Sequence, residues 1–279
     1  MRIRGWGLSD VGRRRDHNED RFLCNDALAL YAVADGMGGH LGGERASRMA
    51  VDIVEAKLAG AFPLAAAVAS SSSPASASLS PVRAAAGLGP DADATPAARS
   101  PAEAMREAIA EADRRIFALS STDPEVAGMG TTLTALLFRD RRAYLGHVGD
   151  SRAYLYRDGH ARQLTEDHSW IQDQVRAGLL TTNEARESRF RNIITRSVGF
   201  EPLVTPDLQD LHPQAGDCFL LCSDGLSNYL SVEEIGQVLT TDFYRDAPRT
   251  LIALANERGG DDNVTCVCVH VANDAPDSD

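Results

Sequence analysis

One short stretch constrains the fold of this chain of 279 residues more than any other. The apolar run 27–34 indicates a buried strand, and it ends at a carboxylate, Asp35. The glycines that follow are Gly36, Gly38, Gly39 and Gly42. Bare backbone lets a small ligand come close, either a phosphate held by N–H groups or a cation held by the carboxylate. The stretch alone leaves both alternatives open, although it lacks the lysine of a phosphate-binding P-loop.

Composition limits the classes of function that the chain can have. Its hydrophobic content of 43% allows a sizeable core, and its length suits one large domain or two small ones. The net charge of −12 argues against nucleic acid or an anionic membrane as a partner. The same acidity suits a site for cations.

The sequence predicts a cytoplasmic protein. No apolar run reaches the roughly 18 residues that span a bilayer, and the charged N-terminus is followed by no apolar signal segment. The five cysteines are odd in number and have no disulfide-framework spacing. Four of them lie in apolar, strand-like runs, where free cysteine is typically a small buried hydrophobe and not a zinc ligand: Cys218, Cys222, Cys266 and Cys268.

Hydrophobic periodicity and capping signals predict the main elements. Helices are expected over 43–58, 100–119, 231 onward and 247–257, the second and third opened by the capping boxes Ser100–Glu103 and Ser231–Glu234. Strands are expected over 3–9, 131–138, 143–148, 152–157, 160–164, 218–222 and 264–271. Because the middle connections are too short for crossover helices, strands 131–164 are predicted to form an antiparallel meander with residues 149–151 at a hairpin tip.

These elements predict a single domain over residues 1–272. Three segments are expected to differ from the regular pattern of helices and strands. The Ala/Ser/Pro-rich stretch 60–99 predicts a disordered insertion, because it cannot bury enough apolar area to order itself. Residues 165–200, with a capping box at Thr181 and Glu184, predict a polar helical lid over a site. The acidic tail 273–279 is expected to fray.

Several aspartates lie at the ends of predicted core strands. An isolated Asp-Gly pair is usually only a turn. A group of carboxylates at strand ends would repel one another unless a metal supplied the counter-charge, and oxygen ligands select Mg²⁺ or Mn²⁺ over Zn²⁺. The cation alternative for the first stretch is therefore favoured. The acidic positions are Asp20, Asp35, Asp150, Asp224 and Asp262.

At these positions the chain resembles the metal-dependent protein phosphatase (PPM, type 2C) family, and in particular its bacterial serine/threonine phosphatases. The matching motifs occur in family order at residues 12–20, 33–40, 130–132, 146–152, 164–169, 223–226 and 262–265. The resemblance implies an α+β fold, a four-layer α-β-β-α sandwich of two antiparallel sheets flanked by helices. It also implies hydrolysis of phosphoserine and phosphothreonine by a water activated between two Mn²⁺ or Mg²⁺ ions.

The resemblance assigns a role to each acidic position. Asp35 would bridge two ions, and their other protein ligands would be the carbonyl of Gly36, Asp224 and Asp262. Asp20 would bind directly or through water. Asp150, with Asp224, matches the position of a third ion in bacterial members. Glu19 and Asn263 would support these ligands.

The groups that act on the phosphate are less completely matched. Arg15 corresponds to the phosphate-binding arginine, whose planar fork suits two phosphate oxygens. Animal members place a histidine, the proposed general acid, directly after the Asp-Gly pair, and this chain has Met37 there. His40 is a candidate substitute. The alternative is that a metal-bound water protonates the leaving oxygen and His40 is structural.

The resemblance implies phosphorylated proteins as partners, among them a Ser/Thr kinase that the enzyme would oppose, and a monomeric state is expected. Two rival hypotheses are a pseudo-phosphatase that binds phosphoproteins without turnover and a phosphatase of small phosphoesters. None of the metal-ligand positions is lost, which argues against the first rival.

Overall fold

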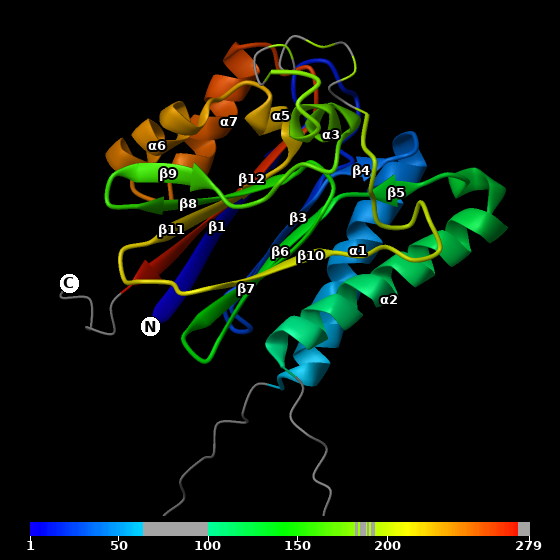
Figure 1. Cartoon of the computed structure of the whole chain (residues 1–279), viewed down its shortest axis with the longest axis horizontal. Coiled ribbons are helices and arrows are strands. Elements are labelled where there is room, and N and C mark those ends of the chain that lie inside the picture. Colours follow the sequence, from blue (N-terminus) through cyan, green and yellow to red (C-terminus); the bar gives the residue numbers. More distant parts are fainter. Residues whose placement is uncertain (64–99, 182–183, 185–187, 189, 191–192, 273–279) are drawn as a thin grey trace, which may run out of the picture.

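Two antiparallel sheets of five strands each form the centre of the structure, a computed structural model that describes residues 1–63, 100–181, 184, 188, 190 and 193–272 (Figure 1). The first sheet has the order β1 (Arg2–Asp10), β12 (Val264–Ala272), β11 (Cys218–Cys222), β8 (Arg152–Arg157) and β9 (His160–Gln163). The second has the order β10 (Asp207–Leu211), β7 (Arg142–Val148), β6 (Leu133–Arg139), β3 (Leu30–Ala34) and β2 (Arg21–Asn25). A separate short pair joins β4 (Gly36–Met37) to β5 (Gly130–Thr131).

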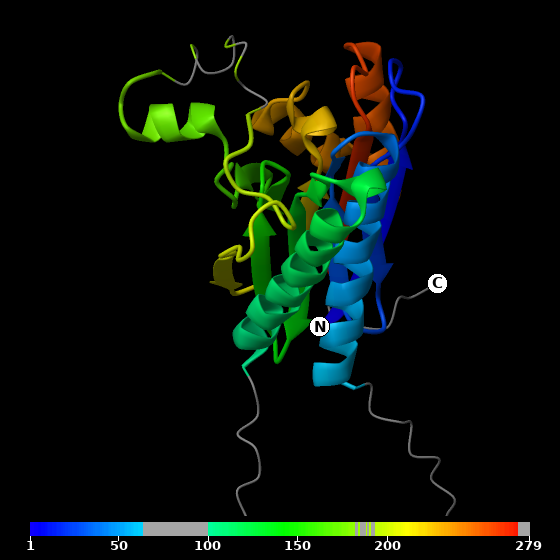
Figure 2. The same ribbon diagram turned by 90° about the vertical axis from the view of Figure 1, so that its right-hand side faces the viewer.

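Helices cover the outer face of each sheet (Figure 2). The second sheet packs under α1 (His40–Ala61) and α2 (Pro101–Thr122), which a 3-10 turn, η1 (Pro124–Val126), follows. The first sheet packs under α5 (Asp224–Ser227), α6 (Val232–Thr241) and α7 (Ala247–Glu257). These are the four layers of an α-β-β-α sandwich, and the predicted α+β fold is confirmed.

A third apolar cluster fills the space between the two sheets. Tyr31 and Phe219 each contact Phe138 edge-to-face, and their ring centroids lie 6.2 and 5.6 Å, respectively, from that of Phe138. All three rings are buried. Fully burying one such side chain contributes roughly 1.5–3 kcal/mol, so this interior layer holds the strand ends of both sheets in fixed relative positions.

The predicted capping boxes are present. Ser100 and Ser231 each accept from the backbone N–H three residues later, and the glutamates there bond back to the cap, so α2 and α6 begin where the sequence predicted. The Thr181–Glu184 pair makes the same reciprocal bonds. Helix α1 is longer than predicted at both ends, and it includes Gly60 and Ala61. Residues 60 and 61 of the expected insertion are therefore helical, and residues 64–99 lie outside the described part of the chain.

The predicted meander is wrong in one respect. Strands β6 and β7 pair as a hairpin, and so do β8 and β9, but β7 and β8 belong to different sheets. Residues 149–151 therefore carry the chain from one sheet to the other and are not a hairpin tip. Gly149, at φ +110, makes the sharp turn possible, and Ser151 is fixed in the sandwich by a 2.7 Å bond between its Oγ and Thr132 Oγ1.

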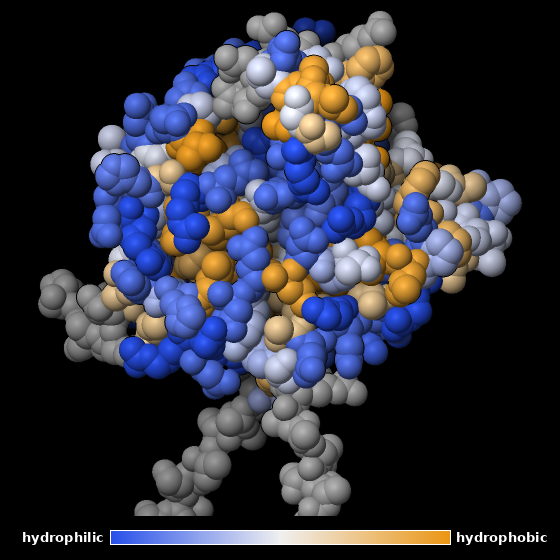
Figure 3. Space-filling view, in the orientation of Figure 1, coloured by the Kyte–Doolittle hydropathy of each residue, from blue (hydrophilic) through white to orange (hydrophobic). Residues whose placement is uncertain are grey.

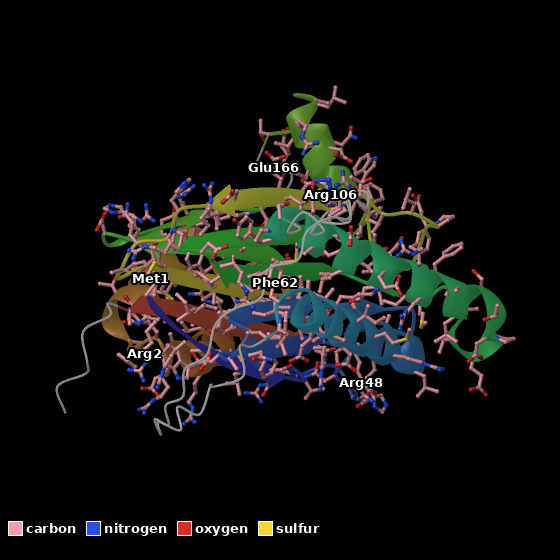
Figure 4. The ribbon with its side chains drawn as sticks, turned by 90° about the horizontal axis from the view of Figure 1, so that it is seen from below. Met1, Arg2, Arg48, Phe62, Arg106 and Glu166 are labelled. Carbon is pink, nitrogen blue, oxygen red and sulfur yellow. The ribbon has the colours of Figure 1, made fainter. Side chains whose placement is uncertain are left out.

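In the lid segment, predicted to be helical over residues 165–200, the described residues 165–169, 177–181 and 193–200 are not helical. Its described residues include one helix, α3 (Trp170–Arg176), which stands away from the sandwich (Figure 2). Seen from below, Glu166 at the start of this segment and Arg48 on α1 lie on opposite sides of the molecule (Figure 4). An apolar group shows at the top of the face in Figure 3, over the segment that carries α3. The apolar side chains exposed along the lid segment are Trp170, Leu179, Phe190, Ile193 and Phe200. Among the described residues, no helix is both long enough and apolar enough to cross a membrane.

Candidate metal centre

The backbone of Asp35 is locked where β3 ends. Its carbonyl accepts from Thr132 N at 2.9 Å and from Thr131 Oγ1 at 2.8 Å, and its N–H donates to Thr132 Oγ1 at 2.9 Å. With these backbone groups satisfied, the Asp35 side chain is left to face the cavity at the end of the sandwich. The two threonines belong to the motif 130–132, and their bonds to Asp35 were not predicted.

Gly36 lies where no side chain fits. A Cβ atom there would come within 2.1 Å of the Gly43 carbonyl oxygen and 2.6 Å of the Glu19 carbonyl oxygen. Both obstacles are backbone, which cannot move aside as a flexible side chain can. The start of α1 and residue 19 are therefore packed directly against the backbone that follows Asp35.

Asp20 reaches the same end of the sandwich from the loop before β2. It is buried, with 8% of its surface exposed, and Ser223 Oγ donates to its Oδ2 at 2.8 Å. Glu19 N–H donates to Asn263 Oδ1 at 2.8 Å, and Ser47 Oγ donates to the Glu19 carbonyl at 2.6 Å. Asn263 and Ser47 thus hold the backbone of the loop that presents Asp20.

The remaining carboxylates arrive from three other places in the chain. Asp150 comes from the crossing between the sheets, Asp224 from the start of α5 and Asp262 from the loop before β12. One cavity of about 340 Å³ is lined by all three together with Asp35 and Gly36. Arg15 opens onto the same cavity, and its Nη2 donates to Asp262 Oδ2 at 2.7 Å.

These carboxylates raise one another's pKa values. Burial raises the pKa of Asp20 to about 7, and the charges of Asp224 and Asp262 add to the effect. Burial also raises the pKa of Asp35 well above its usual range, followed by repulsion from Asp20, Asp224, Asp150 and Asp262. The pKa values of Asp150 and Asp224 are raised for the same two reasons. The site therefore stabilises added positive charge.

A divalent cation fits this donor set. Asp20 Oδ1 and Asp224 Oδ1 are buried and accept no hydrogen bond from the described residues, which is costly for a carboxylate unless a cation takes its place. No three Asp, Glu, His or Cys side chains among the described residues enclose one ion by themselves. The predicted ligand set, which shares Asp35 between two ions and adds the Gly36 carbonyl, stays a prediction. Hard oxygen donors of this kind suit Mg²⁺ or Mn²⁺.

The structure gathers most of the predicted site residues around one cavity. His40 begins α1, but its side chain lies outside the described part of the structure, so its predicted role has no geometry to support it. Ser223, which holds Asp20, was missed as a functional residue although it stands next to Asp224 in the sequence. Ile194 of the lid segment also lines the cavity and was not predicted.

Residues 12–262 match the protein phosphatase 2C family, and the chain belongs to that family. It is 36% identical over 266 residues to the serine/threonine protein phosphatase PstP of Mycobacterium tuberculosis, covering 95% of this chain and 44% of that protein. It is 33% identical over 266 residues to the protein phosphatase PhpP of Streptococcus pneumoniae, covering 94% of this chain and 95% of that one.

Solved structures agree with this membership. The crystal structure of the Mycobacterium tuberculosis serine/threonine phosphatase PstP/Ppp superposes with a TM-score of 0.79 at 33% identity and covers 98% of this chain and 100% of that chain. The catalytic domain of serine threonine protein phosphatase PstP, solved in complex with two manganese ions, gives a TM-score of 0.76 at 33% identity, with 97% and 99% covered.

Proposed function

We propose that this chain is a metal-dependent protein phosphatase that hydrolyses phosphoserine and phosphothreonine in proteins. The observation that carries the proposal is the group of carboxylates with raised pKa values, Asp35, Asp150 and Asp224, that lines one cavity beside Arg15. Two buried oxygens, Asp20 Oδ1 and Asp224 Oδ1, have no hydrogen-bond partner among the described residues. Membership of the protein phosphatase 2C family supports it.

Two Mn²⁺ or Mg²⁺ ions would be held by residues of four different segments. Asp35 would lie between them, the Gly36 carbonyl, Asp224 and Asp262 would complete their protein ligands, and Asp20 would bind directly or through water. A third position would use Asp150 with Asp224. When bound, such ions lower the pKa of a water held between them and neutralise charge that develops on the phosphoryl group.

The chain's own residues orient the substrate. The Arg15 guanidinium, half exposed at the cavity mouth, offers two parallel N–H groups to two phosphate oxygens, a geometry that lysine cannot provide. Gly36 keeps the wall beside Asp35 free of side-chain bulk.

His40 remains the candidate for delivering a proton to the leaving oxygen. If it does so, the loss of rate in His40→Ala should shrink for aryl phosphates with better leaving groups, and a uniform loss would contradict the assignment.

The substrates are phosphorylated proteins, and the cellular role is to oppose a Ser/Thr kinase. A second cavity of about 590 Å³ adjoins the metal centre, shares Asp150 and Asp224 with it and extends under α3 to Ile171 and Val175. It offers room for the chain on either side of a phosphorylated residue. The enzyme acts as a single domain over residues 1–272 and as a monomer, with the lid segment as the part that meets the protein substrate.

Two neighbouring aspartates provide the experiment. Asp262 lines the cavity, whereas Asp261 is exposed and bonds to Tyr229 and Arg14. With Mn²⁺ and a phosphothreonine peptide, Asp262→Ala should lose about 100-fold or more of the rate of phosphate release. Asp261→Ala should keep most of it. Equal losses would refute the ligand assignment, and peptide binding without any release by the parent chain would identify a non-catalytic scaffold.

A further inference from the structure

His168 is a buried residue that the proposed chemistry does not use. It lies between β9 and α3, at the start of the lid segment, with 5% of its surface exposed. Its ring contacts that of His147, with centroids 4.8 Å apart and the ring planes tilted by 40°. Burying an imidazole costs free energy unless its ring nitrogens are hydrogen-bonded, and both nitrogens of His168 have partners.

One side of His168 is bonded to the residue before Asp150. The backbone N–H of Gly149 donates to the ring Nδ1 of His168 at 3.0 Å, and the backbone N–H of His168 donates to the Gly149 carbonyl at 2.7 Å. Because a backbone N–H can only donate, Nδ1 accepts and carries no proton. Both backbone polar groups of Gly149 are therefore taken by a single residue. A Cβ on Gly149 would also meet Thr132 within 2.6 Å, so the crossing loop has little freedom.

The other side of His168 is bonded to the base of the lid segment. Its Nε2 lies 3.2 Å from Asp207 Oδ2 and 3.1 Å from Arg196 Nη1, which donates to Asp207 Oδ1 at 2.8 Å. Because Nδ1 carries no proton, Nε2 of the neutral ring carries it and donates to Asp207. The His168 carbonyl accepts from Thr195 N–H at 2.8 Å, where the lid segment returns to the sandwich. Burial lowers the pKa of His168, which keeps the ring neutral and Nδ1 able to accept.

We propose that His168 is a positioning residue that joins the base of the lid segment to Asp150. Its Nδ1 fixes the Gly149 amide, and this sets the direction in which the next residue, Asp150, presents its carboxylate to a cation shared with Asp224. The proposal rests on the proposed function for the assignment of Asp150 as a ligand. Groups that orient a ligand in this way change metal affinity without touching the metal.

Two substitutions separate the two nitrogens of the ring. In His168→Asn the amide oxygen can occupy the place of Nδ1 and accept from Gly149, while the bond to Asp207 is lost. In His168→Gln the amide reaches the place of Nε2 and can keep Asp207, while the bond from Gly149 is lost. If Nδ1 positions Asp150, Asn should rescue the site and Gln should not.

The measurement is Mn²⁺ binding by calorimetry, with Asp150→Ala identifying the binding step that depends on Asp150. His168→Gln should weaken that step by about 10- to 100-fold, and His168→Asn should leave it close to the parent. His270→Asn, which removes a partly buried imidazole stacked on Tyr244 at the end of β12 away from the metal centre, should have no effect on it. Equal results for Asn and Gln, whether both weaken binding or neither does, would overturn the proposal.

Amide hydrogen exchange on the parent chain tests the same contact without any substitution. The Gly149 N–H should exchange slowly, because it is buried and bonded to Nδ1. Rapid exchange would overturn the proposal even if no variant folds. Failure of the parent to bind Mn²⁺ at all would instead count against the proposed function, while slow Gly149 exchange would still support the contact.

Discussion

At the scale of single residues, Asp20 shows how this fold trades stability for a cation site. It is a buried carboxylate with one oxygen held by Ser223 and the other without a hydrogen-bond partner among the described residues. A solvent-exposed aspartate would keep its hydration and would have no oxygen without a hydrogen-bond partner. The charge of Asp20 becomes favourable only when a cation lies beside it.

This arrangement predicts a pH dependence of stability in the EDTA-treated protein. The pKa of Asp20 is about 7 in the folded chain and 3.8 without the fold. A raised folded pKa gives stability that is complete below about pH 4 and is lost as the pH rises through about 7. Thermal unfolding should therefore show the parent falling behind Asp20→Asn, which cannot ionise, across this range. Parallel curves for the two proteins would contradict the raised pKa of Asp20 in the folded chain.

Gly36 predicts a loss of stability that does not involve charge. Gly36→Ala places a methyl group against two carbonyl oxygens, and overpacking of this kind costs about 1–3 kcal/mol. Chemical denaturation measures the loss. The matched control is Gly60→Ala near the end of α1, where an added Cβ meets nothing within 4 Å and alanine favours the helix by about 1 kcal/mol. Similar changes at the two positions would rule out the close backbone contact.

At the scale of elements, the lid segment differs from the rest of the fold because it buries little apolar surface of its own. Its helix α3 has a single buried side chain, Ile171, whereas α1 and α2 bury a whole face against a sheet. Trp170 stays 38% exposed and meets Phe190 edge-to-face, with ring centroids 5.5 Å apart. Exposed aromatic side chains beside a site are suited to contact a protein substrate.

Trp170→Ala should therefore affect protein substrates selectively. The expected loss in kcat/KM is about 2- to 10-fold for phosphopeptides, corresponding to about 0.5–1.5 kcal/mol of aromatic contact. Hydrolysis of a small aryl phosphate should stay near the parent rate. Phe243→Ala, which removes an exposed aromatic ring that contacts Trp6, is the control and should change neither substrate. An equal loss on peptide and aryl phosphate would show that Trp170 acts on the catalytic centre instead.

At the scale of the whole molecule, the sandwich brings distant parts of the chain to one end. Asp20 and Asp262 are separated by most of the sequence, yet the charge of Asp262 acts on Asp20 directly. Asp224 follows β11 of the first sheet, and Asp35 follows β3 of the second. The metal centre therefore depends on the packing of both sheets and is not the property of a single loop.

Local signals account for the parts of this architecture that could be predicted. The apolar runs before Asp35 and Asp224 define buried strands by themselves, and Ser231 with Glu234 specifies the start of a helix within four residues. The crossing at residues 149–151 could not be predicted in the same way. A connection of three residues suits a hairpin as well as a change of sheet, and only long-range pairing of β7 with β10 and of β8 with β11 decides between them.

The candidate site, too, could be predicted from the sequence only in part. Four of its aspartates could be chosen from the sequence because each stands at the end of a strand-like run beside glycine or asparagine: Asp35, Asp150, Asp224 and Asp262. Asp20 could be added because it lies beside a short strand. Ser223 and His168 could not, because their roles depend on bonds to Asp20 and Gly149, residues that lie far away in the chain. The side chain of His40 lies outside the described residues, so its predicted role as the general acid stays a prediction.

We propose that a divalent-cation centre built on Asp35 hydrolyses phosphorylated serine and threonine in proteins. Phosphate release from a phosphothreonine peptide, measured with Mn²⁺, after EDTA and after Mn²⁺ is restored, tests it most directly. We predict rapid release with Mn²⁺, none with EDTA and full recovery when Mn²⁺ returns. Release that survives EDTA, or that never occurs with Mn²⁺ or Mg²⁺, would contradict the claim.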